Sequence, residues 1–431
     1  MTEVVGPPSA AGTNWGGNLT YSAARFHRPE SVEALQEIVR RASTVKALGT
    51  RHSFSSVADT AGDLVSLEQL SRTVRVDTER RTVRIEGGVR YGELGAALHA
   101  QGFALPNLAS LPHLSVAGAC ATGTHGSGDT SPVLASAVTR LELLTASGDL
   151  MELSPEQDED LFRGAVVSLG ALGIVTALTL AVEPTYEVRQ DVYEQLPLAQ
   201  VAAHFDEVMS GADSVSLFTT WQHDTFHQAW LKRRVPGPAV PAPRTWFTAT
   251  LAERDLHPVA GQSGTPCTPQ GGRPGPWFER WPHFRTGHTP SSGEEVQSEY
   301  LFPREHAPAA LRALFALGSQ LAPLLLVSEV RTVAADAFWL SPCSGQDCAA
   351  VHFTWRQDEP AVRALLPQIE AALAPFGARP HWGKVFVTPP QHWPGRPSRL
   401  ADFRDLMQTL DPGGKFQNAF LKSVFADSQH R

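Results

Sequence analysis

The feature that most constrains the fold is a short segment, Leu48-Gly49-Thr50-Arg51-His52-Ser53-Phe54, which follows the apolar run Val45-Lys46-Ala47-Leu48. A glycine directly after a strand lets the backbone turn sharply and present its amide N–H groups to an anion. One histidine, His52, lies within this turn. A lone histidine after a glycine turn is more often a surface or core residue than a cofactor ligand. The segment therefore needs support from the rest of the chain before it can be interpreted as a cofactor loop.

A second loop gives that support. Residues 109–128 consist mostly of glycine, alanine, serine and threonine. Small residues let the backbone approach a flat ligand or a pyrophosphate, whose oxygens their N–H and hydroxyl groups can bind. The alternative is a glycine-rich surface loop, but this stretch has apolar residues and few charges, unlike a solvated linker. The stretch has no G-x-G-x-x-G motif at the start of a helix, and the chain has no P-loop motif, so neither type of nucleotide site is predicted.

Composition excludes several classes of partner. The 431 residues carry a formal net charge of −8, which argues against nucleic acid or an anionic membrane as a partner. That length suggests two or three domains. No apolar run is long enough to span a membrane. The four cysteines form no C-x-x-C pair and fit no common zinc pattern, so we expect no metal site and a reduced, cytoplasmic protein. We also expect a monomer. The cysteines are Cys120, Cys267, Cys343 and Cys348.

Residue periodicity in the first part of the chain predicts alternating strands and helices, which suits a binding domain. The predicted elements are a helix over 29–42, a hairpin over 73–85, a helix over 91–101, a hairpin over 141–153, a helix over 160–169 and a strand over 173–182.

The second part of the chain places polar residues within three otherwise apolar predicted strands. A polar pair on one strand usually faces water, but three such strands together favour a polar floor under a pocket. The residues are Glu329 and Arg331 in 325–333, His352 and Thr354 in 351–355, and Lys384 in 381–386. A helix is predicted over 401–410.

The two loops and the C-terminal motif Asp411-Pro412-Gly413-Gly414-Lys415-Phe416-Gln417-Asn418 resemble the vanillyl-alcohol oxidase superfamily of flavoproteins, and more closely its alditol oxidases. The resemblance covers nearly the whole chain. One departure is Arg51, where many relatives have glycine. The resemblance implies an α+β fold with an FAD-binding domain over 14–183, a mixed-sheet cap (substrate) domain over 184–400, and a segment over 401–431 that returns to the FAD domain.

The resemblance also implies an FAD cofactor bonded covalently through His52 to the 8α-methyl carbon of the flavin. That bond prevents loss of the cofactor and makes the flavin a stronger oxidant, which suits oxidation of an unactivated alcohol. The other residues implied to contact FAD are Ala47, Leu48, Gly49, Thr50, Arg51, Ser53, Ser110, Ser115, Gly118, Thr122, Gly123, Thr124, His125, Ile174 and Asn418.

By the same resemblance, the substrate site is lined by Ser110, Glu329, Arg331, Thr354 and Lys384, with His352 close by. Arg331 and Lys384 are the expected catalytic residues. A cationic Arg331 would stabilise a developing alkoxide. A desolvated Lys384 with a lowered pKa can accept the hydroxyl proton. The remaining polar residues can bind further hydroxyl groups.

The function implied is oxidation of the terminal CH–OH of an alditol, such as xylitol or sorbitol, to the aldehyde, with reduction of molecular oxygen to hydrogen peroxide. An aldonolactone oxidase is a close alternative, because it shares the fold and the His381-Trp382-Gly383-Lys384 type of segment. The sequence of residues 329–336 favours the alditol oxidases over the lactone oxidases, by resemblance alone. A flavin-binding or sugar-binding protein without turnover is the alternative of another class.

Overall fold

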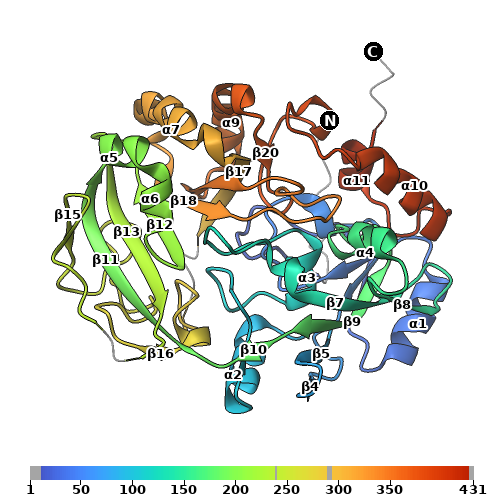
Figure 1. The fold of residues 1–431 in the computed structure, drawn as a ribbon. Coiled ribbons are helices and arrows are strands. Elements are labelled where there is room, and N and C mark those ends of the chain that lie inside the picture. Colours follow the sequence, from blue (N-terminus) through green and yellow to red (C-terminus); the bar gives the residue numbers. More distant parts are fainter. Residues whose placement is uncertain (1–10, 238–239, 289–293, 427–431) are drawn as a thin grey trace.

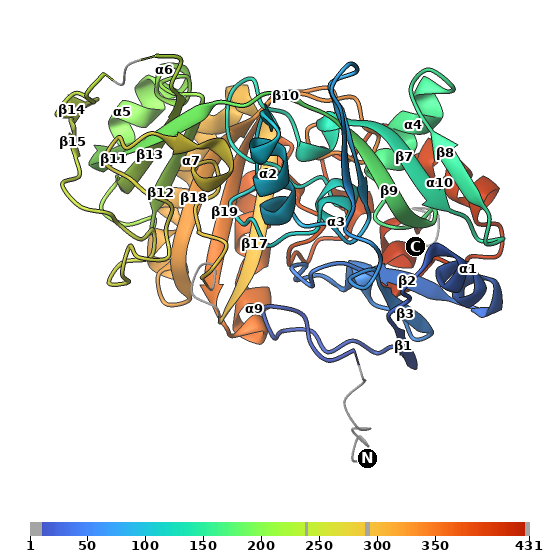
Figure 2. The ribbon, with the colours of Figure 1, turned by 90° about the horizontal axis from the view of Figure 1, so that it is seen from below.

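The structure is a computed structural model that describes residues 11–237, 240–288 and 294–426. Two large sheets organise the chain and lie side by side (Figures 1 and 2). The five-stranded sheet comes from residues 74–181, and the ten-stranded sheet comes from residues 187–380. Helices pack on both, so the predicted α+β class is confirmed.

The first half of the chain builds the five-stranded antiparallel sheet, in the order β4-β5-β9-β7-β8, and a small parallel sheet, β1-β3-β2. Its elements are β1 (Arg25–His27), α1 (Val32–Arg41), β2 (Val45–Leu48), η1 (Ser56–Ala58), β3 (Asp63–Ser66), β4 (Val74–Asp77), β5 (Thr82–Glu86), α2 (Tyr91–Ala100), β6 (Phe103–Ala104), α3 (Val116–Ala121), η2 (Leu134–Ala137), β7 (Val138–Leu144), β8 (Leu150–Leu153), α4 (Glu159–Val166), β9 (Ile174–Ala181) and β10 (Glu183–Pro184).

The second half builds the large sheet, in the order β14-β15-β11-β13-β12-β18-β19-β17-β20, with β16 paired to β11. Its elements are β11 (Glu187–Pro197), α5 (Leu198–Ala203), α6 (Phe205–Met209), β12 (Ser214–Thr219), β13 (Thr225–Arg234), β14 (Thr245–Trp246), β15 (Ala249–Leu251), β16 (Gly275–Pro276), η3 (Trp277–Glu279), β17 (Glu295–Pro303), η4 (Arg304–His306), α7 (Ala307–Ala316), α8 (Gly318–Leu321), β18 (Leu325–Val333), β19 (Cys348–Arg356), α9 (Glu359–Leu373), η5 (Ala374–Phe376), β20 (Arg379–Pro380), η6 (Pro390–His392), α10 (Leu400–Leu410) and α11 (Ala419–Val424).

Strand alternation gives the large sheet two different faces. On β17 and β19, side chains such as Tyr300 and Phe353 pack in one hydrophobic core with residues of α7 and α9. Successive side chains on a strand point to opposite faces, so Glu299 and His352 point away from these helices. The sheet therefore presents a polar surface on the side that the helices leave open.

Most of the elements predicted from periodicity are confirmed. The hairpins are β4–β5 and β7–β8, the strand over 173–182 is β9, and the helices over 91–101 and 401–410 are α2 and α10. The first helix begins later than predicted, at Val32, because the Ser31 hydroxyl caps it by accepting a hydrogen bond from the Ala34 N–H at 3.2 Å.

The strand predicted over 381–386 is wrong. The ladder ends with β20 at Pro380, and a turn follows, closed by a hydrogen bond from the Lys384 N–H to the His381 carbonyl at 3.0 Å. The His381 ring reinforces this turn by accepting from the Gly383 N–H at 3.1 Å. The apolar residues around Gly383 predicted a strand, but local hydrogen bonds form a turn instead.

The loop that contains His52 is tied to this distant turn. The Phe54 N–H donates to the Gly383 carbonyl at 2.7 Å, and the Ser55 hydroxyl donates to the Trp382 carbonyl at 2.7 Å. The C-terminal helices return to the first half as well, since α10 and α11 share a core cluster with α4 and the five-stranded sheet. The domain boundaries at 183 and 400 stay predictions.

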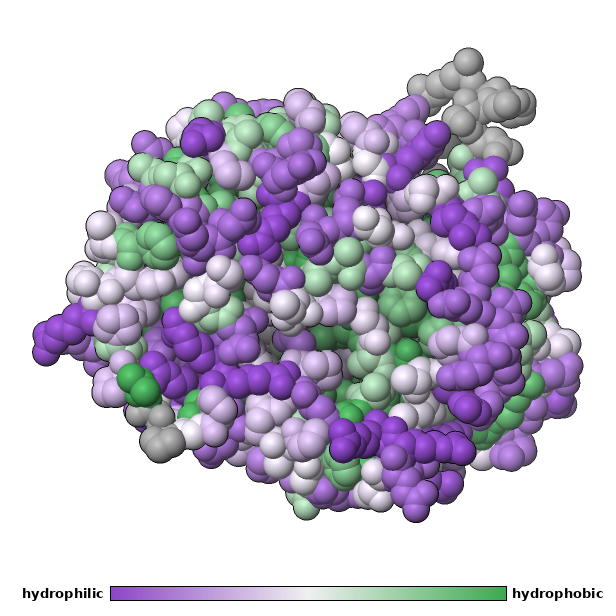
Figure 3. Space-filling view, in the orientation of Figure 1, coloured by the Kyte–Doolittle hydropathy of each residue, from purple (hydrophilic) through white to green (hydrophobic). Residues whose placement is uncertain are grey.

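Polar residues cover most of the face seen in Figure 3, and a hollow near its centre is lined by more apolar residues. In the described residues, no helix combines the length and hydrophobicity that crossing a membrane requires.

Arg51 has a left-handed backbone, with φ of +65°. This conformation costs an L-residue about 1 kcal/mol or more but costs glycine nothing, which explains why glycine suits the position. The arginine offsets the strain through its side chain. Its guanidinium donates to the carbonyls of Ala11 and Thr13 and lies 5.7 Å from the Tyr21 ring centre.

We predict that Arg51→Gly changes the free energy of unfolding by no more than about 1 kcal/mol, because relief of backbone strain offsets the lost contacts. Arg51→Val should destabilise the protein by about 2–3 kcal/mol, because a β-branched residue is disfavoured at positive φ and also loses the contacts. Urea unfolding measures both. Arg75→Val, at an exposed position of β4, is the control, and equal effects of the Gly and Val variants would contradict this explanation.

Candidate active site

A cavity of about 480 Å³ lies where the His52 loop, the small-residue stretch and the large sheet meet. The His52 loop follows β2, and the small-residue stretch leads into and out of α3. The polar residues of β17, β18 and β19 line the cavity from the side of the large sheet. One wall is therefore made of glycine-rich backbone, and another carries charged side chains.

The cavity brings together most of the residues predicted for the cofactor and all of those predicted for the substrate. Its lining includes Ala47, Leu48, Gly49, Thr50, Arg51, His52, Ser53, Ser110, Ser115, Gly118, Thr122, Thr124 and His125, and also Glu329, Arg331, His352, Thr354 and Lys384. Segments separated by more than 300 residues in sequence thus meet at one site.

Three predicted cofactor residues, Gly123, Ile174 and Asn418, lie outside this lining. Asn418 caps α11 by accepting from the Leu421 N–H at 2.9 Å. Its amide nitrogen donates to backbone carbonyls at both ends of η1, including that of Asp59 at 2.7 Å. The side chain therefore holds the segment after the His52 loop in place, and its contact with FAD stays a prediction.

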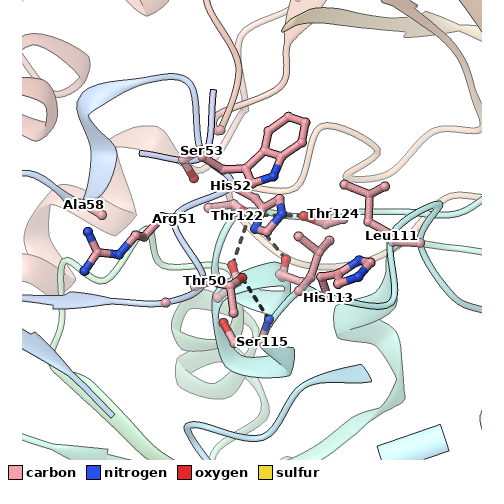
Figure 4. Close-up of a pocket in the computed structure, with 18 of the residues that line it drawn as sticks. Thr50, Arg51, His52, Ser53, Ala58, Leu111, His113, Ser115, Thr122 and Thr124 are labelled. Carbon is pink, nitrogen blue, oxygen red and sulfur yellow. Dashed lines mark hydrogen bonds between the residues drawn. The ribbon is translucent and has the colours of Figure 1, made fainter. Parts of the chain in front are cut away.

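In the glycine-rich wall, two loops approach each other so closely that side chains would clash, which leaves a surface of backbone and small groups for a flat ligand. A Cβ atom at Gly49 would lie 2.7 Å from the Ser115 hydroxyl oxygen, and one at Gly118 would lie 2.8 Å from it. The Thr50 hydroxyl accepts from the Ser115 N–H at 3.2 Å, and the hydroxyls of Thr122 and Thr124 lie 3.2 Å apart (Figure 4). Backbone and hydroxyl groups at such a surface fit the ring and pyrophosphate of a dinucleotide.

His52 lines the cavity half-buried, with both ring nitrogens inaccessible to water, and its ring is neutral. Burial lowers its pKa to about 4, although the Thr50 backbone opposes the shift. Neither ring nitrogen makes a hydrogen bond of ordinary geometry to the described residues. The Trp15 ring stacks on the imidazole, with ring centres 5.3 Å apart and an angle of 16° between the planes. A buried imidazole with unpaired nitrogens is costly unless another group binds it, which fits a bound cofactor.

The polar floor follows from strand register. His352 on β19 is directly opposite Glu299 on β17 and Glu329 on β18, and Thr354 is opposite Gln297. Residues directly opposite each other point to the same face of a sheet. The register therefore places these five side chains on the face that lines the cavity.

Arg331 lies between two buried carboxylates. Its Nη2 forms an ion pair with Glu299, and its Nε lies 3.7 Å from Glu329 Oε1. Burial alone would raise the pKa of each carboxyl group, but Arg331 and neighbouring histidines outweigh it and hold both well below the ordinary value. His125 is one of these neighbours, with Nε2 3.4 Å from Glu299 Oε1. The site thus holds two carboxylates and one guanidinium, all ionised.

Lys384 adds a group that can exchange a proton near neutral pH. Burial lowers its pKa to about 8, with Glu299 opposing the shift and Arg331 adding to it. Its ammonium donates to Gln297 Oε1 and lies 5.1 Å from the Phe54 ring centre. The turn over 381–384, rather than a strand, brings this side chain into the cavity.

Several residues of the site were not predicted from the sequence, above all Glu299 and Gln297. Both lie on β17, where Glu295, Gln297 and Glu299 alternate with other residues in the same period-two pattern that drew attention to Glu329 and Arg331. The signal was therefore present in the sequence. His283 was also missed, and its place in a loop after η3 gives no periodic signal.

Comparisons with known proteins agree with this geometry. Residues 23–154 match the FAD binding domain family, and residues 292–424 match the D-arabinono-1,4-lactone oxidase family. An alditol oxidase from Streptomyces sp. is 50% identical over 421 residues, which cover 96% of this chain and 99% of that protein. An L-gulono-1,4-lactone dehydrogenase from Mycobacterium tuberculosis is 29% identical and covers 96% of this chain and 98% of its own length.

Solved structures share the fold at low identity. A solvent-stable cholesterol oxidase superposes with a TM-score of 0.77 at 14% identity, covering 97% of this chain and 100% of its own. The extent of the match to the alditol oxidase, together with the FAD binding domain, decides the assignment. This protein belongs to the alditol oxidase family of FAD-dependent oxidases, within the vanillyl-alcohol oxidase superfamily.

Proposed function

We propose that this protein oxidises the terminal CH–OH of an alditol, such as xylitol or sorbitol, to the aldehyde and reduces molecular oxygen to hydrogen peroxide. The observation that carries the proposal is the polar floor, in which Arg331, two carboxylates and Lys384 line one side of the cavity. A polyol offers many hydroxyl donors, and each buried one needs an acceptor, at a cost of roughly 1–3 kcal/mol if it is left unpaired.

The His52 loop and the small-residue stretch would hold FAD, which would supply the redox chemistry as acceptor of the substrate hydride and donor of electrons to oxygen. The residues of the floor supply the rest. Neutral Lys384 accepts the proton of the reacting hydroxyl group, and Arg331 stabilises the negative charge that develops on its oxygen. Glu329 accepts hydrogen bonds from other hydroxyl groups, and Ser110 and Thr354 bind further ones.

An aldonolactone oxidase remains the second candidate, because the C-terminal part of the chain matches a lactone oxidase family. Two ionised carboxylates favour the alditol. A carboxylate accepts hydrogen bonds but cannot donate, so it suits a chain of hydroxyl groups better than a lactone carbonyl. The partners in this proposal are a small polyol and molecular oxygen. The monomeric state and the cytoplasmic location stay predictions.

The direct test is peroxide formation with matched substrates. We expect oxygen uptake and equimolar peroxide with xylitol and sorbitol, and much slower turnover with an aldonolactone. The reverse order would move the function to lactone oxidation. Flavin that stays oxidised when an alditol is added without oxygen would instead indicate a binding protein without turnover.

We also propose that His52 carries the FAD covalently. The neutral ring, its unpaired nitrogens and its place beside the glycine-rich wall support this attachment. After acid precipitation, the wild-type pellet should keep its flavin, whereas His52→Ala should release essentially all of it to the supernatant. His113→Ala changes another histidine of the same cavity and should keep the flavin in the pellet. Flavin retained by His52→Ala would contradict the assignment.

The proton-transfer role of Lys384 predicts a pH dependence. Because its pKa is lowered to about 8, the neutral form that accepts a proton is scarce at pH 6 and predominates above pH 8. We expect kcat/KM to rise about tenfold per pH unit below this pKa and to level off above it. Lys384→Met should lose most of the activity together with this dependence. A wild-type profile that stays flat between about pH 6 and pH 9 would exclude Lys384 as the proton acceptor.

A further inference from the structure

A buried lysine and a buried histidine lie in a row with Glu329, and the proposed mechanism does not use them, although the histidine also lines the cavity. Lys232 is on β13 and is 1% exposed, and His283 is 6% exposed. Lys232 Nζ lies 3.1 Å from His283 Nδ1, and His283 Nε2 lies 2.8 Å from Glu329 Oε1. The three side chains form a continuous hydrogen-bonded row that ends at the cavity.

The hydrogen bonds of Lys232 fix which nitrogen of His283 carries the proton. An ammonium group has three N–H donors and no acceptor. Lys232 directs them to the Trp281 carbonyl at 2.6 Å, the Pro282 carbonyl at 2.9 Å and His283 Nδ1. Burial lowers the pKa of Lys232 to about 7, so below that pH its ammonium group makes Nδ1 accept, which leaves the proton of a neutral ring on Nε2. Burial, reinforced by Lys232, lowers the pKa of His283 to about 4, so the ring is neutral.

The imidazole is also held rigidly. Its ring packs edge-on against Trp230 and Phe218, with ring centres 5.1 Å and 5.7 Å away. Its backbone N–H donates to the Ser110 carbonyl at 2.9 Å. His283 thus contacts two residues proposed to bind substrate, Glu329 through its ring and Ser110 through its backbone.

At Glu329, two neighbours share one oxygen. His283 donates to Oε1, and Arg331 Nε lies 3.7 Å from the same atom, with the Ser216 hydroxyl near the carboxylate as well. We propose that Lys232 and His283 are positioning residues that hold Glu329 through Oε1, so that its Oε2 accepts a hydrogen bond from one particular hydroxyl group of the substrate. This inference rests on the proposed alditol oxidation and extends it to the basis of hydroxyl recognition.

Two substitutions of His283 test whether its hydrogen bond to Glu329, rather than the volume of its side chain, affects substrate binding. The amide nitrogen of a glutamine side chain reaches about as far as Nε2 of histidine, so His283→Gln can keep the hydrogen bond to Oε1. The shorter His283→Asn cannot. We expect His283→Gln to keep the KM for xylitol within about threefold, and His283→Asn to raise it about tenfold or more, with a smaller change in kcat. Lys232→Met should behave like His283→Asn. Flavin content and melting temperature serve as controls for folding.

KM values for a set of monodeoxy-xylitols distinguish positioning of Glu329 from a merely structural role, because a structural defect would raise KM equally for every analogue. If Glu329 accepts from one hydroxyl group, the KM penalty of His283→Asn should disappear for the single analogue that lacks it. An equal penalty with every analogue, equal behaviour of the Gln and Asn variants, or a wild-type KM in His283→Asn would overturn the inference.

Histidine labelled with ¹⁵N reports the tautomer of His283 in the wild-type protein itself. Below the pKa of Lys232, about 7, the expected spectrum has His283 protonated at Nε2 and unprotonated at Nδ1, and comparison with His283→Gln assigns the signal. The opposite tautomer would overturn the inference. A wild-type protein that oxidises no alditol would instead refute the proposed function, whatever the tautomer, so the two failures are distinguishable.

Discussion

The active site depends on one buried guanidinium between two buried carboxylates. Arg331 pairs with Glu299 and approaches Glu329, and all three side chains are removed from water. Taking three charges out of water costs several kcal/mol each, and only close pairing in good geometry offsets that cost. Loss of any one charge would leave the others uncompensated, so the arrangement is stable only as a unit. The cost of this arrangement at a cavity surface supports the proposed catalytic role of Arg331.

The large sheet supplies that unit because its order in space differs from its order in sequence. β17 lies beside β19, which lies beside β18, and this places Glu299, His352 and Glu329 in one row across three strands. The helices on the opposite face bury the alternate side chains in a hydrophobic core. Packing on one face therefore fixes the register that aligns the charges on the other.

The sequence predicted the site best where local chemistry was enough. The glycine turn before His52, most of the small residues over 109–128 and the paired polar residues of β18 and β19 line the cavity. It failed where long-range contacts decide. Glu299 lines the site because β17 pairs with β19, a pairing that periodicity alone does not reveal. It also failed at Lys384 for a local reason, because apolar composition suggested a strand where a turn closed by His381 forms. Resemblance implied that Asn418 contacts the cofactor, which stays a prediction, and its side chain also holds η1 through backbone carbonyls.

The ties between the His52 loop and the turn over 381–384 bear on how the protein matures. Phe54 and Ser55 are held by the carbonyls of Gly383 and Trp382, which the ribosome adds more than 300 residues later. Asn418 braces the adjacent segment from still nearer the end of synthesis. A nascent chain that already displays His52 therefore lacks the supports that shape its loop. The loop therefore takes its final shape only in chains whose two parts have already closed on each other.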